Sequence, residues 1–280
     1  MACTHDADGV ADGNPSQTPE IHWRRNDRAL LHCWVHAVGK STACSNEVDL
    51  SYGPRNAAPL LGCMIKMYGF WRSAASFRVR IALNLKGLAY DEEMINLDAQ
   101  EQNAPEYVTK NAQASVPTVF FDDQPPMTQS LAILEYLDER HPVPGLLPND
   151  AESRARVRSI ALMFAADHHP LIVPRVRRYL TETLKVSDDA RTDWIRYWFR
   201  EGLRQAEKRL SVEPETGRFC HGDHPTIADL CLVSQVVGAK GFQVDMSDLP
   251  TVSQITASCL DIEAFARAHP LNQPGAPASH

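Results

Sequence analysis

The chain has 280 residues, of which 44% are hydrophobic and 22% charged, a composition typical of globular proteins. Its 28 Lys and Arg residues against 35 Asp and Glu residues give a net charge of -7, which disfavours a nucleic-acid partner. No apolar run reaches the ~18 residues of a membrane span, and the N-terminus lacks the features of a secretory signal. The seven cysteines are odd in number and form no C-x-x-C pair, so we expect a reduced cytoplasmic protein with free thiols.

Residues 1–63 carry no sustained periodicity. We interpret them as a leader, either disordered or an upstream extension translated from an early start codon. His32 and His36 stand four residues apart there, but further ligands at a familiar spacing are missing, so we predict no metal site. Met64 opens the first regular pattern, and we place the start of the folded part at this residue.

Short apolar runs alternate with helical periodicity between residues 64 and 140. The pattern predicts a strand at 65–70, a helix at 77–86, a strand at 90–97, a short helix within 99–110, a strand at 116–121, a return at 126–128 and a helix at 129–140. Ser76 is the expected N-cap of the first helix, and Gly87 is expected just past its end. This order predicts an α+β thioredoxin-like domain.

The remainder of the chain is predicted to be helical. Residues 141–150 hold three prolines and one glycine and are typical of a linker. Residues 151–280 form an expected all-α domain with helices at 151–184, kinked at Pro170 and Pro174, and at 188–210, 226–237 and 250–268. Thr226 and Asp229 have the spacing of a capping box, and residues 270–280 are an expected frayed tail.

Three features of the first domain could carry chemistry. Ser73 precedes the first helix, whose N-terminus could hold a thiolate, although the serine could equally act as a simple cap. A cis bond at Val116–Pro117 would present the backbone of Val116 to a peptide, whereas an ordinary trans proline would not. Gln129 and Ser130 open a helix that could bind a carboxylate, with N-capping as the alternative.

From Met64 to about Gln273 the chain resembles the zeta class of cytosolic glutathione transferases, which contains maleylacetoacetate isomerase and bacterial maleylpyruvate isomerase. Several motifs carry the resemblance, and the RVRIAL and QSLAI stretches are the most specific of them. They lie at 70–83 (FWRSAASFRVRIAL), 116–118 (VPT), 129–137 (QSLAILEYL), 146–148 (LLP), 226–233 (TIADLCLV) and 242–245 (FQVD).

The resemblance implies a set of glutathione-binding positions. Ser73 would hydrogen-bond the glutathione thiolate, and Val116, before a cis Pro117, would pair with the backbone of the tripeptide's cysteine. The γ-glutamyl end would be held by two further residues, and two more would touch the tripeptide elsewhere. These residues are Gln129 and Ser130, then Gln102 and His169.

The resemblance also implies substrate-binding arginines at Arg72 and Arg175, since guanidinium forks match carboxylates, although both could be solvated surface residues. Three departures stand out. The usual Ser-Ser-Cys-Ser of the first loop is Ser-Ala-Ala-Ser at 73–76, and Asn111 is followed by alanine in place of proline. Gly241 replaces an arginine, for which the neighbouring Lys240 could substitute as a point charge.

The implied activity is glutathione-dependent cis–trans isomerisation of a maleyl-type dicarboxylate in aromatic-compound or tyrosine catabolism. The substrate would be maleylacetoacetate or maleylpyruvate, glutathione would be the cofactor, and its thiol would add to the double bond and leave again. A homodimer is expected from the family. Two alternatives stay open: a transferase that conjugates or dehalogenates α-halo acids, and a non-catalytic glutathione-binding protein.

Overall fold

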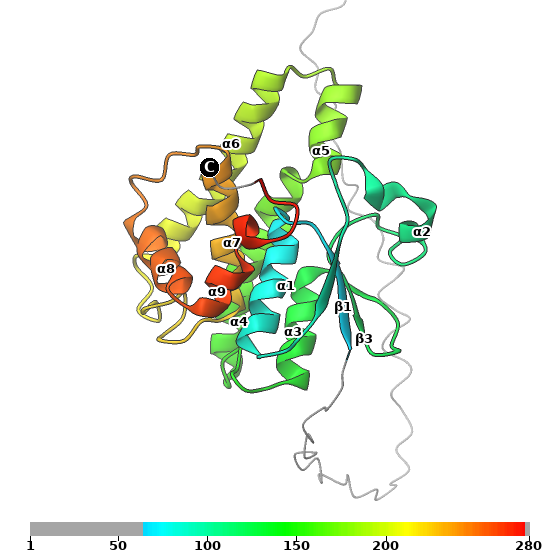
Figure 1. Cartoon of the computed structure of the whole chain (residues 1–280). Coiled ribbons are helices and arrows are strands. Elements are labelled where there is room, and N and C mark those ends of the chain that lie inside the picture. The colour runs from blue at the N-terminus through cyan, green and yellow to red at the C-terminus, as the bar shows by residue number, and fades with distance from the viewer. Residues whose placement is uncertain (1–63, 278–280) are drawn as a thin grey trace, which may run out of the picture. The chain divides into compact units, whose positions relative to one another are not determined.

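The computed structural model describes residues 64–277 (Figure 1). The predicted leader and its pair of histidines lie outside these residues. The described part contains a four-stranded sheet in the order β2-β1-β3-β4. Strand β1 (Ile65–Gly69) is parallel to β2 (Asp91–Met94) and antiparallel to β3 (Thr118–Phe121), and β3 is antiparallel to β4 (Met127–Thr128).

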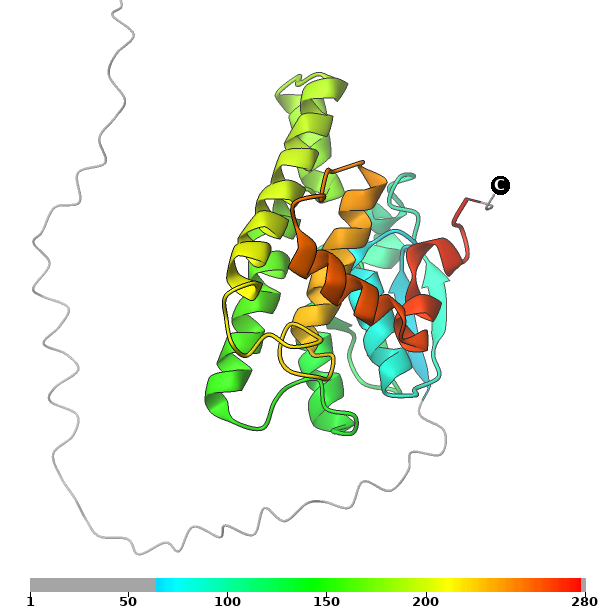
Figure 2. The same ribbon diagram turned by 90° about the vertical axis from the view of Figure 1, so that its left-hand side faces the viewer.

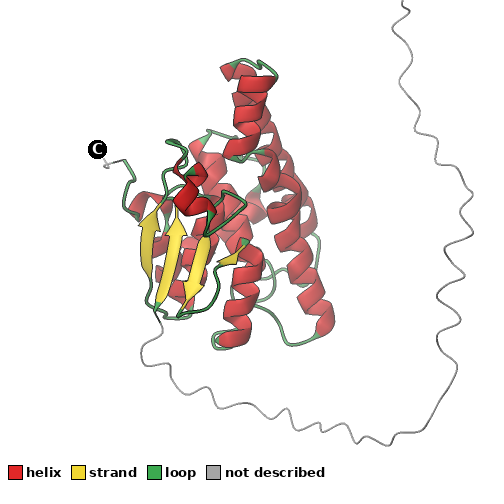
Figure 3. Cartoon of the chain, turned by 90° about the vertical axis from the view of Figure 1, so that its right-hand side faces the viewer, coloured by secondary structure: helices red, strands yellow, loops and turns green. Residues whose placement is uncertain are grey.

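Helices α1 (Ala74–Leu85) and α3 (Ser130–Arg140) cover one face of this sheet, and α2 (Pro105–Val108) lies on its other side (Figures 1 and 3). Helix α1 makes the crossover that a parallel pair such as β1 and β2 requires. It packs against α3 and also against α7 (Ile227–Gly241) and α9 (Glu263–Ala268). Its middle is therefore buried all round, including both arginines of the RVRIAL stretch, Arg78 and Arg80.

The predicted N-cap of α1 is wrong by three residues. The helix begins at Ala74, and Ser73 is the cap, because its Oγ accepts a hydrogen bond of 3.2 Å from the N–H of Ser76. Ser76 is fully buried, and its own Oγ accepts a 3.3 Å hydrogen bond from the N–H of Phe70. Gly87 follows the helix with a φ of +66°, as predicted for a residue at this position.

The rest of the described chain is helical. It comprises α4 (Ala151–Leu162), the π-helical turn η2 (Met163–His168), the 3-10 turn η3 (His169–Leu171), α5 (Pro174–Arg178), the π-helical turn η4 (Tyr179–Thr183), α6 (Asp188–Leu210), α7, α8 (Pro250–Leu260) and α9. Two further 3-10 turns lie at Glu101–Asn103 and Pro270–Asn272. The predicted interruption of the 151–184 helix near its two prolines is confirmed. Helices α5 and α6 project together beyond the other helices (Figure 2).

The predicted single helix at 250–268 is wrong. Helix α8 ends at Leu260, Ile262 is extended, and α9 starts at Glu263. Helix α8 packs on α6 and α7, whereas α9 turns away to pack on α1, where Phe265 is fully buried. One straight helix could not make both contacts, so tertiary packing decides the break.

The fold class predicted from the sequence is confirmed: an α+β thioredoxin-like part is followed by an all-α part. One continuous apolar core joins the two, running from the inner face of the sheet through α1 and α3 to α4, α6, α7 and α8. Cys220, Cys231 and Cys259 are buried free thiols in it. None of the described helices is both long enough and apolar enough to cross a membrane.

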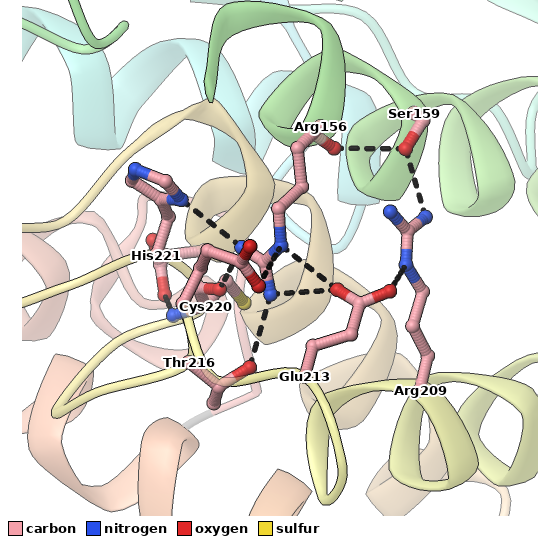
Figure 4. A network of polar contacts seen from close by, with 9 residues as sticks. Arg156, Ser159, Arg209, Glu213, Thr216, Cys220 and His221 are labelled. Carbon is pink, nitrogen blue, oxygen red and sulfur yellow. Dashed lines mark hydrogen bonds and ion pairs between the residues drawn. The ribbon is translucent and has the colours of Figure 1, made fainter. Parts of the chain in front are cut away.

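Arg156 of α4 holds the loop between α6 and α7 (Figure 4). Its guanidinium donates to Glu213 Oε2 at 2.8 Å, to the carbonyl of Cys220 at 2.8 Å and to Thr216 Oγ1 at 3.0 Å. The loop then leads into the predicted capping box, which is confirmed. The buried carboxylate of Asp229 accepts hydrogen bonds from the N–H groups of Thr226, at 2.8 Å, and of Cys220, at 2.7 Å.

Candidate active site

The loop between β1 and α1 carries Arg72 and Ser73. The N–H of Ser73 donates to the carbonyl of Phe70 at 3.0 Å, which closes the turn. Because the Ser73 oxygen already accepts the N–H of Ser76, the hydroxyl proton is left to donate elsewhere. Ser73 is partly buried at the positive end of α1. Capping and anion binding, the two alternatives for this residue, are therefore compatible with each other.

The loop before β3 is fixed by a buried polar cluster. Asn111 Nδ2 donates to the carbonyl of Ser115 at 2.8 Å and to Thr118 Oγ1 at 3.0 Å, and the Tyr107 hydroxyl donates to the same carbonyl at 2.6 Å. The next peptide bond, Val116–Pro117, is cis. Within residues 64–277 neither the N–H nor the C=O of Val116 takes part in a hydrogen bond. The backbone of this residue is therefore available to a peptide-like ligand.

The start of α3 is in contact with a buried cation, the guanidinium of Arg78. Ser130 is the first helical residue and is 7% exposed. Arg78 of α1 donates from Nη1 to Ser130 Oγ at 3.3 Å and from Nε to Ser234 Oγ at 2.9 Å. The preceding residue, Gln129, has a φ of +69°, and its exposed side chain donates to Gln113 Oε1 at 2.8 Å.

Arg78 is a candidate site residue that the sequence analysis did not single out. It is 1% exposed, no described carboxylate pairs with it, and its Nη2 has no hydrogen-bond partner within residues 64–277. Burial lowers the pKa of Arg78 below that of a free guanidinium. A buried cation without a counter-ion favours an anion bound at the neighbouring Ser130.

Gln102 and His169 are two further predicted site residues with polar side chains. Gln102 is 5% exposed, and its Oε1 finds no partner among the described residues. Burial, together with the positive charges of Arg78, Arg175 and Arg177, lowers the pKa of His169 to about 3. The imidazole is therefore neutral at pH 7, with one nitrogen that donates and one that accepts.

The three predicted substrate-binding cations differ in their surroundings. Arg72 is exposed, forms an ion pair with Asp98 and stacks over the rings of Phe70 and Trp71 at 5.5 and 5.7 Å. Arg175 is an exposed residue of α5 whose charge acts on His169. Lys240 is exposed in the last turn of α7, where burial of His269 and, second to it, the charge of Lys240 lower the pKa of His269. No contact within the described chain joins Lys240 to the other predicted site residues.

Comparison with known proteins places this geometry in a family. Residues 64–139 match the glutathione S-transferase N-terminal domain. The chain is 42% identical to the probable maleylacetoacetate isomerase of Vibrio cholerae over 212 residues, covering 75% of this chain and 97% of the relative. It is 40% identical to the maleylpyruvate isomerase of a Ralstonia species, covering 75% and 99%.

The crystal structure of maleylacetoacetate isomerase from Methylobacterium extorquens AM1, with bound malonate and glutathione, is 51% identical. It matches with a TM-score of 0.74 and covers 76% of this chain and 100% of that one. The chain belongs to the maleylacetoacetate isomerase family, in the zeta class of glutathione transferases. The resemblance drawn from the sequence is thereby confirmed.

Arg177 is a second arginine of this zeta-class chain that the sequence pattern did not indicate as a site residue. Arg177 lies on α5, two residues beyond Arg175, and is partly buried while Arg175 is exposed. Its guanidinium carbon is 5.9 Å from the centre of the Phe242 ring, and its buried Nε has no partner within residues 64–277. The one signal in the sequence was the density of arginines, three within 175–178.

Proposed function

We propose that this chain is a glutathione-dependent cis–trans isomerase of a maleyl-type dicarboxylate, maleylacetoacetate or maleylpyruvate. The observation that carries the proposal is the N-terminus of α1 at Ser73, which can hold an anion and directly follows Arg72. Two further arginines, Arg78 and Arg177, have nitrogens without partners within residues 64–277, and the charge of Arg72 acts on Arg177. The names of the relatives support the same reaction. The bound malonate of the Methylobacterium enzyme is itself a dicarboxylate.

The residues present fit glutathione as the cofactor. Buried polar atoms lack partners at Arg78 and Gln102 within residues 64–277, and the backbone of Val116 is free on both sides. The residues that would hold the tripeptide are Ser73, Gln102, Val116, Pro117, Gln129, Ser130 and His169. Bound glutathione supplies a thiolate that adds to the cis double bond and then leaves, so that the bond can rotate before it reforms.

The chain's own residues supply three effects. The Ser73 hydroxyl would donate a hydrogen bond to the sulfur at the positive end of α1, and this favours the thiolate over the thiol. A shift of about two units in a thiol pKa corresponds to about 2.7 kcal/mol. Arg72 and Arg175 would hold substrate carboxylates, with Lys240 as an added positive charge. Neutral His169 would hydrogen-bond the tripeptide without adding charge.

We further propose the division of the chain on which this function rests. Residues 64–140 would be the glutathione-binding domain, 141–150 the linker and 151–280 the substrate-binding domain, after a leader at 1–63. The enzyme would act as a cytoplasmic homodimer. Sedimentation equilibrium or light scattering of the purified full chain at micromolar concentration tests the dimer, and a monomer mass would contradict it.

The decisive experiment is an isomerase assay with maleylacetoacetate and maleylpyruvate, each with and without glutathione. We expect conversion to the fumaryl isomer of at least one substrate, strict dependence on glutathione and no net consumption of the thiol. Net loss of glutathione with dichloroacetate, and no isomerisation, would favour the halo-acid transferase. Tight glutathione binding without turnover of any of these compounds would favour a binding protein.

A further inference from the structure

Arg177 is a guanidinium without an anion of its own. It forms no hydrogen bond or ion pair with any residue in the described range, and its buried Nε has lost its hydration without gaining an acceptor. Such a group is costly to keep unless something else satisfies it. The guanidinium carbon lies 5.9 Å from the centre of the Phe242 ring, and that ring in turn lies 5.7 Å from the ring of Phe199.

The neighbouring contacts place Arg177 opposite the loop that carries Ser73. Arg178 donates to Gln100 Oε1 at 2.6 Å and so ties α5 to the turn at 96–103. The same turn carries Asp98, which is already paired with Arg72. Burial and the charge of Arg72 lower the pKa of Arg177, while Asp98 opposes them. Asp98 is therefore paired with Arg72 and also acts electrostatically on Arg177.

The position of Arg177 next to Phe242 indicates which substrate carboxylate it could bind. Gly241, the residue before Phe242, has no side chain, and the contact with Phe242 brings Arg177 beside this position from α5. Arg72 directly precedes Ser73, so a carboxylate bound by Arg72 would lie close to a thiolate held at Ser73. Arg177 is separated from that loop by the Asp98 turn, so a carboxylate that it binds lies farther along the substrate.

We propose that Arg177 binds the substrate carboxylate remote from the double bond and thereby selects dicarboxylates over monocarboxylates. The inference rests on the proposed isomerase function. It assigns to α5 a part of the substrate specificity. The planar fork of an arginine suits this task better than the point charge of the exposed Lys240.

The test compares a dicarboxylate with a monocarboxylate of the same reaction. Arg177→Met and Arg177→Lys are assayed with the preferred dicarboxylate and with maleylacetone, which lacks the remote carboxylate. We expect Arg177→Met to lower kcat/KM for the dicarboxylate by about 10- to 100-fold, mainly through KM, and to leave maleylacetone within about twofold. Arg177→Lys should recover part of the loss, and the Kd of glutathione should not change.

Arg196→Met is the matched control, because Arg196 is an exposed guanidinium that donates to the carbonyl of the same Phe242 at 2.9 Å. It should leave both substrates unaffected. An equal loss on both substrates, or no loss on the dicarboxylate, would overturn the inference and leave the isomerase function standing. A wild-type enzyme without isomerase activity would overturn both. If Arg177→Met does not fold, Arg177→Lys carries the same comparison.

Discussion

Arg78 donates a hydrogen bond to Ser130 across 3.3 Å, and through it a fully buried cation touches the first residue of α3. The direction of this bond matters, because Arg78 can only donate and Ser130 Oγ therefore accepts. The Ser130 hydroxyl proton is then left for a ligand. A carboxylate bound there would gain both this donor and the uncompensated charge beneath it.

Replacing Arg78 with methionine is expected to weaken glutathione binding. The change removes the buried charge and the orientation of Ser130 while keeping a long apolar side chain in the core. Because a hydrogen bond to a charged group is worth about 1.5–3 kcal/mol, we expect the Kd of glutathione, measured by calorimetry, to rise about 10- to 100-fold. Substrate kcat at saturating glutathione should change much less.

A double-mutant cycle separates positioning from general loss of packing. Arg78→Met should have a smaller effect on the Kd in a Ser130→Ala background than in the wild type, since the two residues act as a unit. Ser234→Ala is the matched control, because Ser234 is the other hydroxyl bonded to Arg78, at 2.9 Å, but lies on α7. Strict additivity of Arg78→Met and Ser130→Ala would contradict the positioning role.

Replacing Ser73 with alanine should cost both activity and stability. Loss of the cap is worth about 0.5–2 kcal/mol of unfolding free energy, and loss of the donor to the thiolate should lower kcat/KM about 100-fold. Ser187→Ala is the matched control, since Ser187 caps α6 through the same contact, a 3.3 Å hydrogen bond from Ala190 N–H. It should lose stability alone. Unchanged turnover in Ser73→Ala would remove Ser73 from the mechanism.

The elements that local signals define were predicted well. The limits of α6 match its periodic pattern at 188–210, and the capping box of α7 follows from residues three apart. The start of α1 was misplaced because two serines, Ser73 and Ser76, could both cap it. The choice depends on Phe70, whose N–H engages Ser76 and leaves Ser73 as the cap.

The polar residues missed in the site have partners that are distant in sequence. Arg78 meets Ser130 52 residues later and Ser234 156 residues later, so no periodicity or spacing could reveal its role. It lies in the middle of a helix between apolar residues, so the sequence pattern indicated only a core-facing segment there. Arg177 was missed for another reason, since two further arginines lie beside it in sequence and only packing distinguishes the one whose Nε is buried.

His169 should make the stability of the protein depend on pH. Its pKa is about 3 in the folded protein, below the value of about 6.5 for an unfolded chain, so the unfolded state binds more protons. The stabilisation is present above about pH 6.5 and is lost as the pH falls towards 3. Between pH 7.5 and 5.0, urea unfolding should show the wild type losing about 1 kcal/mol more than His169→Gln, after allowance for partial exposure.

The comparison of the two proteins isolates His169, because all other histidines titrate in both. Parallel curves of unfolding free energy against pH would mean that the imidazole is not held neutral by the burial and the arginines around it.

Arg156 should be a major source of stability through the loop that it holds (Figure 4). Replacing it with methionine leaves Thr216 and the carbonyl of Cys220 without this donor, and Glu213 keeps only its ion pair with Arg209. Because the arginine is largely buried, with 10% of its side chain exposed, we expect a loss of about 3 kcal/mol of unfolding free energy in urea denaturation.

The pair of Arg204 and Glu201 is the matched control for Arg156, since the Arg204 side chain is 52% exposed. Arg204→Met should leave the unfolding free energy almost unchanged, because exposed ion pairs contribute little. Equal costs for the two variants would mean that the α6–α7 loop does not depend on Arg156.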